Sequence, residues 1–135
     1  MSVFLTQTEE GQYRQRITID RHTLFADARV DHIDSDSAPN PHDLYDASLA
    51  ACKAITLMMY AERANIPLEG IDVGIVRDSS EEASGTYRLQ VELELKGALE
   101  ESQRSRLEKV AEKCPLHKLM TSVTTVITSS CKLAE

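Results

Sequence analysis

Tryptophan is absent from this 135-residue chain, and only six residues are Phe or Tyr. A basic excess is also absent, since 22 acidic residues against 15 Lys and Arg give a formal net charge of −7. No stripe of Lys or Arg is present, so we expect no nucleic-acid partner. The longest apolar stretches are broken by Lys53 and Glu62, so we predict no membrane span. A charged start followed by an apolar run and a cleavage site is lacking, so we expect no signal peptide.

Cysteine is scarce, with three residues that form neither a CxxC half-site nor a dense disulfide framework. We therefore expect a reducing cytoplasm, where a disulfide is more often transient and catalytic than structural. Cys131, near the C-terminus, is expected to be incidental. His117 forms a C-x-x-H pattern with Cys114, but no second pair follows at zinc-ligand spacing, so we predict no metal site. Walker, GxGxxG, GxSxG and HExxH motifs are all missing, and we expect no cofactor.

The length suits one domain over residues 1–135, built around one long helix. Asn40 is a residue type common at N-caps, and Pro41 fits the first helical position. Asn65 and Pro67 are expected to end the helix. Its apolar residues cover a wide arc, which indicates a central helix buried on more than one side.

Strands and shorter elements are predicted on both sides of this helix. They are a strand over 12–19, a turn at 20–21, a return strand over 22–29, strands over 71–76 and 87–95, a helix between Gly97 and Cys114, a turn from Pro115 and a last strand over 122–130. The strict alternation over 87–95 indicates one buried and one wet face, antiparallel to the preceding strand. This order predicts an α+β fold rather than alternating βαβ units.

The two inner cysteines each allow a functional and a structural interpretation. Cys52 lies in the third turn of the long helix, where burial in an apolar face disfavours the thiolate, so reactivity would need a cation from another segment. The alternative is a small buried hydrophobe. Cys114 would be an N-cap if Pro115 opens a helix, and free backbone amides would then favour its thiolate. The alternative is a capping or core residue at a helix junction.

Carboxylates in the first turns of the long helix also have two interpretations. In the structural interpretation, Asp43 and Asp46 are solvated carboxylates that the positive end of the helix dipole stabilises. In the functional interpretation, Asp43 points inward and fixes an arginine guanidinium in a bidentate pair beside the thiolate of Cys52.

Two stretches resemble motifs of the OsmC/Ohr family, the osmotically induced proteins and organic hydroperoxide resistance proteins. The family's core helix has Pro, an acidic residue, Leu and a run of small residues ending in Cys, which here are Pro41, Asp43, Leu44 and 47–52 (ASLAAC). The second motif, Cys-Pro and an apolar residue, matches 114–116 (CPL). The predicted element order agrees over nearly the whole chain. The sequence looks closest to members that also occur fused to hydrolase domains.

The resemblance implies an OsmC-like fold, in which antiparallel sheets wrap around a long central helix in an intertwined homodimer. In active members the helix cysteine attacks the distal peroxide oxygen, and the second cysteine closes a disulfide. A small dithiol or a lipoylated protein then reduces that disulfide. Carried over, Cys52 is the attacking thiol and Cys114 the resolving thiol.

The resemblance also implies an acidic residue and an arginine at the site. Asp43 stands where many members have Glu, although some subgroups place that Glu at the position of His42. The activating arginine comes from the N-terminal strands, where we assign Arg21. The other candidates in that region are Arg14, Arg16 and Arg29.

Three hypotheses for the function follow. The leading one is a cytoplasmic peroxidase that reduces organic hydroperoxides through a Cys52 sulfenate and a Cys52–Cys114 disulfide. The second is a non-peroxidase OsmC-like dimer that binds an apolar small molecule or a thiol carrier. The third is a stress-associated structural dimer without a site. An arginine and a carboxylate that both meet Cys52 would favour the first.

Overall fold

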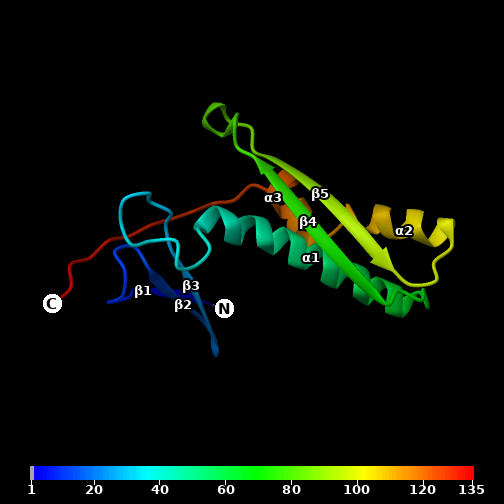
Figure 1. Cartoon of the computed structure of the whole chain (residues 1–135), viewed down its shortest axis with the longest axis horizontal. Coiled ribbons are helices and arrows are strands. Elements are labelled where there is room, and N and C mark those ends of the chain that lie inside the picture. The colour runs from blue at the N-terminus through cyan, green and yellow to red at the C-terminus, as the bar shows by residue number, and fades with distance from the viewer. Residues whose placement is uncertain (1) are drawn as a thin grey trace. The chain divides into compact units, whose positions relative to one another are not determined.

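The computed structural model describes residues 2–135, and the chain forms two compact units. The first comprises residues 1–50 and 75–91, and the second comprises residues 51–74 and 92–135. Helices and antiparallel strands occur together, which confirms the α+β prediction (Figure 1). No helix over residues 2–135 combines the length and apolar character that a membrane span requires. One domain over residues 1–135 stays a prediction.

The first unit contains a three-stranded antiparallel sheet in the order β1-β2-β3 (Figure 1). Its strands are β1 (Val3–Gln7), β2 (Gln15–Ile19) and β3 (His22–Ala26). A two-residue turn at Asp20 and Arg21 joins β2 to β3, and Asp20 has φ 53°. Asp tolerates this left-handed conformation well, so the turn is formed at little cost. The predicted hairpin is confirmed, with strands shorter than the sequence pattern indicated.

Helix α1 spans Pro41–Arg63, and its first turn is closed by a reciprocal pair of hydrogen bonds. The Asn40 side chain accepts from the Asp43 amide at 2.8 Å, and the Asp43 carboxylate accepts from the Asn40 amide at 3.2 Å. Each bond satisfies an amide that has no partner within the helix. At the other end, Asn65 has φ 55° and turns the chain away. Both predicted ends of the helix are therefore confirmed.

Strands β4 (Gly70–Asp78) and β5 (Arg88–Lys96) form a two-stranded antiparallel ribbon (Figure 1). A short 3₁₀ helix, η1 (Glu82–Ser84), lies in the connection between them. Burial alternates along both strands, so that each has one face of half-buried residues and one exposed face. This alternation is the one that the apolar–polar pattern predicts.

The second unit holds the largest apolar cluster, to which α2 (Glu101–Ala111) contributes. Leu57 and Leu107 are fully buried at its centre, together with Ala61, Ile66 and Ala111. Helix α3 (Pro115–Ser122) follows α2 after a short break, with Cys114 as its N-cap. The sequence predicted this N-cap, although it predicted a turn and not an eight-residue helix.

The last predicted strand is wrong for this chain. Residues 123–130 have no regular secondary structure and pair with no strand among residues 2–135. Val126 and Ile127 are 82% and 81% exposed. β-Branched residues favour an extended backbone, but a strand also needs a neighbour to pair its N–H and C=O groups. The sequence pattern supplies the first condition and not the second.

Candidate functional site

The second unit brings the thiols of Cys52 and Cys114 together. Cys52 lies midway along α1, and Cys114 lies between α2 and α3. The Cys52 side chain is close enough to the Cys114 thiol to raise its pKa, and both cysteines are free. Cys114 is completely buried, whereas Cys52 is half-buried. The two residues are far apart in sequence, and their pairing as attacking and resolving thiols stays a prediction.

Cys114 caps α3 through its sulfur. The His117 amide donates to Cys114 Sγ at 3.4 Å, as expected for an N-cap that accepts from the third residue of the helix. Burial raises the pKa of the Cys114 thiol, while the His117 amide and the charge of Lys53 oppose that increase. The sulfur therefore lies in a dry place that nevertheless contains two groups favouring its anion.

Lys53 is the buried cation of this site, with an exposed fraction of 2%. Its Nζ donates to the Ala111 carbonyl oxygen at 2.8 Å and lies 3.0 Å from His117 Nδ1. A lysine ammonium can only donate, so His117 Nδ1 accepts and the ring carries its proton on Nε2. That Nε2 lies 3.7 Å from the exposed Glu112 carboxylate. Side chains from α1 and α3 thus form one polar chain beside Cys114.

The surroundings of Cys52 and Cys131 differ from those of Cys114. Cys52 Sγ has Thr56 Oγ1 at 4.0 Å, one helical turn further along α1. Cys131 is exposed in the C-terminal segment. Over residues 2–135, no three His, Cys, Asp or Glu side chains are grouped as ligands of a metal ion would be.

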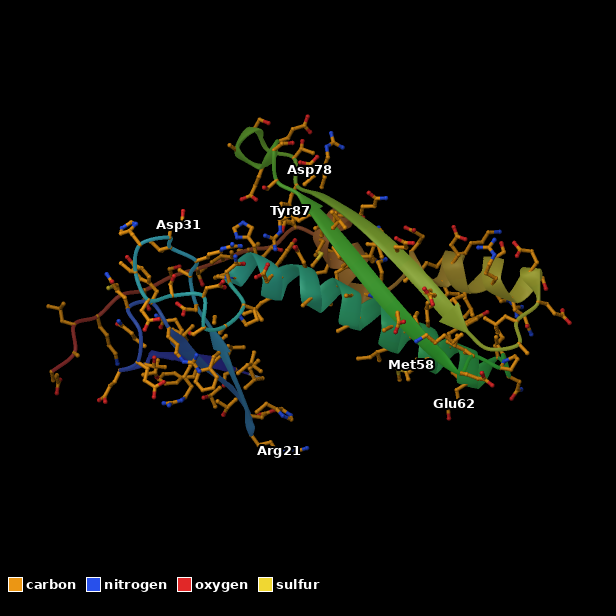
Figure 2. The ribbon with its side chains drawn as sticks, viewed as in Figure 1. Arg21, Asp31, Met58, Glu62, Asp78 and Tyr87 are labelled. Atoms are coloured by element: carbon orange, nitrogen blue, oxygen red, sulfur yellow. The ribbon has the colours of Figure 1, made fainter. Side chains whose placement is uncertain are left out.

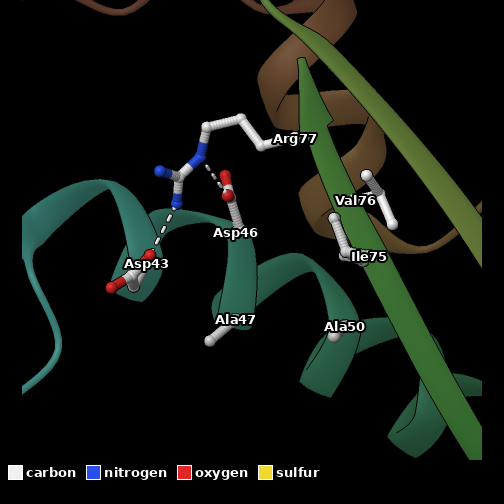
Figure 3. A pocket seen from close by; sticks show the side chains of 7 residues that line it. All are labelled: Asp43, Asp46, Ala47, Ala50, Ile75, Val76 and Arg77. Atoms are coloured by element: carbon white, nitrogen blue, oxygen red, sulfur yellow. Dashed lines mark hydrogen bonds and ion pairs between the residues drawn. The ribbon is translucent and has the colours of Figure 1, made fainter. Parts of the chain in front are cut away.

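In the first unit, Arg77 of β4 is held between two carboxylates of α1. Its Nη2 donates to Asp43 Oδ1 at 2.8 Å, and its Nε donates to Asp46 Oδ2 at 2.7 Å (Figure 3). The Arg77 guanidinium holds the pKa of Asp43 below its ordinary value. The two carboxylates raise the pKa of Arg77 in turn. A cavity of about 540 Å³ lies at this ion cluster, lined also by Ala47, Ala50, Ile75 and Val76.

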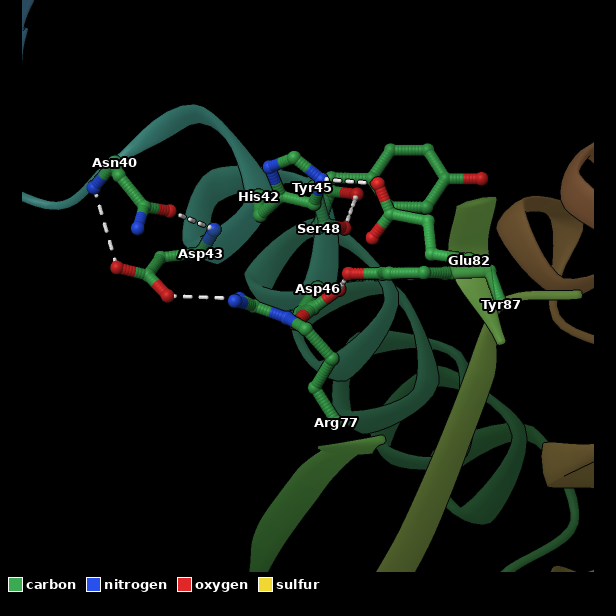
Figure 4. A network of polar contacts seen from close by, with 9 residues as sticks. All are labelled: Asn40, His42, Asp43, Tyr45, Asp46, Ser48, Arg77, Glu82 and Tyr87. Carbon is green, nitrogen blue, oxygen red and sulfur yellow. Dashed lines mark hydrogen bonds and ion pairs between the residues drawn. The ribbon is translucent and has the colours of Figure 1, made fainter. Parts of the chain in front are cut away.

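Tyr87, the residue just before β5, extends this cluster. Its hydroxyl donates to Asp46 Oδ1 at 2.6 Å (Figure 4). Burial and the Asp46 carboxylate together raise the pKa of Tyr87 to about 12. The Tyr87 ring packs edge-on against Tyr45, with 5.8 Å between the ring centres. His42, the position at which some subgroups of the family have their Glu, is exposed. Its Nε2 lies 3.0 Å from the Glu82 carboxylate.

Some of the predicted site residues lie where they were expected, and others do not. Cys52 lies near Cys114 and raises the pKa of its thiol, and Asp43 holds a guanidinium as expected, but that guanidinium belongs to Arg77. Arg21 lies at the exposed turn between β2 and β3 and forms no pair with Asp43 within this chain (Figure 2). Its assignment as the activating arginine stays a prediction.

Sequence analysis missed Lys53 and Arg77, although each had a signal. Lys53 lies four residues after Leu49 and four before Leu57, and all three are buried on one row of the helix. Arg77 follows Val73 and Ile75 on the half-buried face of β4. A charged residue on a row of apolar residues is expected to have a specific partner, because an unpaired buried charge is expensive.

Comparison with known proteins agrees with this architecture. The profile of a family described as OsmC-like protein matches residues 34–129. Among solved structures, an OsmC-like protein of Mycoplasma pneumoniae is 19% identical with a TM-score of 0.73, covering 90% of this chain and 87% of that one. A search of curated proteins found no match.

Two further structures are named for organic hydroperoxide resistance. OhrB of Bacillus subtilis is 24% identical with a TM-score of 0.60, covering 90% of this chain and 92% of that one. A protein of Elizabethkingia anophelis is 21% identical with a TM-score of 0.60, covering 90% and 89%. At these identities the likeness shows a shared fold.

Proposed function

We propose that this chain, which belongs to the OsmC-like protein family, is a cytoplasmic thiol peroxidase that reduces organic hydroperoxides. The observation that carries the proposal is that half-buried Cys52 lies near the buried Cys114 thiol, whose pKa it raises. Two thiols that lie near each other can form a disulfide if their Cα atoms come within about 7 Å. The choice of organic hydroperoxides is supported by the names of the similar Bacillus and Elizabethkingia proteins.

The different exposures of the two thiols favour separate roles. Half-buried Cys52 is the thiol that a peroxide can reach, and fully buried Cys114 is not. The Cys52 thiolate attacks the distal oxygen, the O–O bond breaks, and the released alkoxide takes a proton to leave as an alcohol. Cys114 as thiolate then attacks the Cys52 sulfenic acid. An S–S bond forms, the S–O bond breaks, and hydroxide takes a proton to leave as water.

The remaining predicted components belong to the same proposal. A small dithiol or a lipoylated protein reduces the disulfide, and no bound cofactor or metal takes part. Arg21 activates the Cys52 thiolate, and Asp43 orients a guanidinium. Replacement of Arg21 by Ala should slow alkylation of Cys52 at neutral pH, with Arg29→Ala as the matched control. Slowing by Arg29→Ala alone would reassign the role to that residue.

The protein is further proposed to act as a homodimer. Ile55, Met58 and Met59 on α1 are each more than half exposed, at 57%, 56% and 57%. They line an open apolar cavity of about 530 Å³ in the second unit. A second copy of the chain would cover such a surface and complete an apolar pocket for the carbon part of the peroxide.

The test is consumption of cumene hydroperoxide under a dithiol reductant by the wild type and three single variants. Cys52→Ser should abolish turnover, because no attacking thiol remains. Cys114→Ser should allow one oxidation per chain at Cys52 and no disulfide. Cys131→Ser is the matched control and should turn over like the wild type, since Cys131 is exposed and lies outside the pair.

The choice of peroxide gives a second readout on the same reduced protein. Burying about 100 Å² of the cumyl group would contribute about 2.5 kcal/mol, or roughly 70-fold in rate over hydrogen peroxide. Equal and slow rates for both peroxides, with all three variants like the wild type, would leave the non-peroxidase binding protein as the better hypothesis.

A further inference from the structure

We propose that Lys53 is a positioning residue that stabilises the anionic sulfur of Cys114 whenever the Cys52–Cys114 disulfide is made or reduced. The proposal deepens the function proposed above and rests on it for the reduction step. Its structural basis is the burial of Lys53 and its two hydrogen-bond partners, Ala111 and His117.

A buried ammonium is costly, and the fold holds this one in a defined place. Transfer of an unpaired charge from water into a protein interior costs several kcal/mol, so buried lysines are retained with partners. Lys53 Nζ has the carbonyl of Ala111, which ends α2, and the ring of His117, which lies in the first turn of α3. Both partners flank Cys114 in the sequence. Lys53 is thus hydrogen-bonded to the last residue of α2 and to the first turn of α3, and Cys114 lies between these two helices.

Helices α1 and α3 supply the groups that face the Cys114 sulfur. From α1 come Cys52, which raises the pKa of the Cys114 thiol, and Lys53, whose charge lowers it. From α3 comes the His117 amide, which donates to the sulfur, while the His117 ring faces Lys53 and Glu112. Lys53 is therefore the group in these surroundings that supplies positive charge to the sulfur.

The chemistry requires an anion at Cys114 in both directions. To close the disulfide, the Cys114 thiolate attacks the Cys52 sulfenic acid, and hydroxide leaves with a proton as water. To open it, an external thiolate bonds to the more accessible Cys52 sulfur, the S–S bond breaks, and the electron pair stays on Cys114. A thiol with a lower pKa leaves faster, so the cation should accelerate reduction. The buried sulfur gains most, because charges interact more strongly where water is excluded.

The test titrates Cys114 alone, in a Cys52→Ser, Cys131→Ser protein, by the ultraviolet absorbance of its thiolate. Lys53→Met should raise the apparent pKa of Cys114 by about one unit or more, as loss of a nearby opposite charge does. Lys113→Met is the matched control. Lys113 precedes Cys114 directly but is exposed, so solvent screens its charge and the titration should not move. Equal titrations of the Lys53→Met protein and its parent would overturn the proposal.

Loss of folding in Lys53→Met would be detected by circular dichroism, and His117→Leu then serves as the second variant. It keeps the lysine and the backbone amide of residue 117 but removes one anchor of Nζ. A smaller increase in the apparent pKa is expected, and an unchanged titration in the folded variant would overturn the proposal. The titration needs no peroxide, so its outcome does not depend on whether the protein is a peroxidase.

A kinetic measurement on the oxidised three-cysteine protein tests the reduction step. Dithiothreitol should reduce the Cys52–Cys114 disulfide several-fold more slowly in Lys53→Met than in Lys113→Met, because Cys114 becomes a poorer leaving group. Faster or equal reduction would overturn the proposed role. Failure of any disulfide to form in the wild type would count against the proposed peroxidase, while the Cys114 titration would still decide the role of Lys53.

Discussion

Tyr87 and Asp46 are joined by a 2.6 Å hydrogen bond from the phenol to Oδ1, while Oδ2 of the same carboxylate binds Arg77. The carboxylate of Asp46 is largely buried, at 8% exposed, so both oxygens need partners. The Asp46 side chain of α1 is thus fixed by Arg77 of β4 and by Tyr87, the residue just before β5. This relationship connects the first turns of α1 to the strand ribbon within the first unit.

Removing the phenol oxygen should destabilise the protein. Tyr87→Phe keeps the ring but leaves Asp46 Oδ1 unpaired, and a hydrogen bond to a charged group contributes about 1.5–3 kcal/mol. We expect a loss of about 2 kcal/mol in urea unfolding at neutral pH. Tyr45→Phe is the matched control, because Tyr45 contacts the same ring and is 46% exposed. Equal stability of the two variants would contradict a structural role for the bond.

The Asp43–Arg77 pair should make stability depend on acid pH. The folded-state pKa of Asp43 lies below its ordinary value of 3.8, chiefly because Arg77 donates to it. Its contribution is therefore complete above pH 3.8 and is lost as the pH falls through the lower, folded-state value. Asp43→Asn should lower the melting temperature at neutral pH. The difference in melting temperature from the wild type should shrink as the pH falls below 3.8 and through the folded-state pKa of Asp43. Asp31→Asn, in the exposed loop before α1, is the matched control and should leave the melting temperature at neutral pH unchanged.

Local sequence was enough to predict most of the elements and the two caps, but it indicated a strand over 122–130 that the chain does not form and a turn where α3 lies. Asn40 with Asp43, and Cys114 with Pro115, are signals whose partners lie within three residues, so the chain near each position determines the structure. The pairing of Cys52 with Cys114 is implied by the family resemblance and stays a prediction, because no local pattern links two residues so far apart in sequence.

The cations of the site depend on long-range packing. Asp43 requires an arginine, but Arg77 is reached only once β4 lies beside the start of α1. The row of Leu49 and Leu57 marked the buried side of α1, yet a lysine within that row is acceptable only because Ala111 and His117 provide acceptors. Sequence patterns report which side of an element is buried. They do not report which distant group satisfies a charge there.

Gly97 should be far more sensitive to substitution than Gly74. Gly97 has φ +136°, and a Cβ atom there would collide with the Pro67 carbonyl oxygen. At Gly74, in β4, a Cβ atom would meet open space. We expect Gly97→Ala to cost at least about 2 kcal/mol and Gly74→Ala to be neutral or slightly stabilising. Urea unfolding of the two variants measures the difference, and similar midpoints would contradict the steric argument.

The exposed C-terminal segment leads to the last prediction, that the protein is a dimer held in part by residues 123–130. This segment is rich in β-branched residues, and its Val126 and Ile127 are more than four-fifths exposed. Single exposed apolar residues are ordinary, but a run with strong strand propensity and no pairing partner in residues 2–135 can be buried by a second chain. Met58 and Met59 of α1 are also more than half exposed, and a second chain could cover them as well.

Sedimentation velocity at micromolar concentration should show a dimer for the wild type and a monomer for the double variant Val126→Asp, Ile127→Asp. Two carboxylates in a paired strand would have to be desolvated, which costs far more than leaving the segment in water. Leu133→Asp is the matched control, because Leu133 is 92% exposed but lies beyond the β-branched run. A monomeric wild type would exclude the dimer. If the double variant stayed dimeric, the interface would lie elsewhere, and the open cavity at Ile55 and Met58 on α1 would be the surface to substitute next.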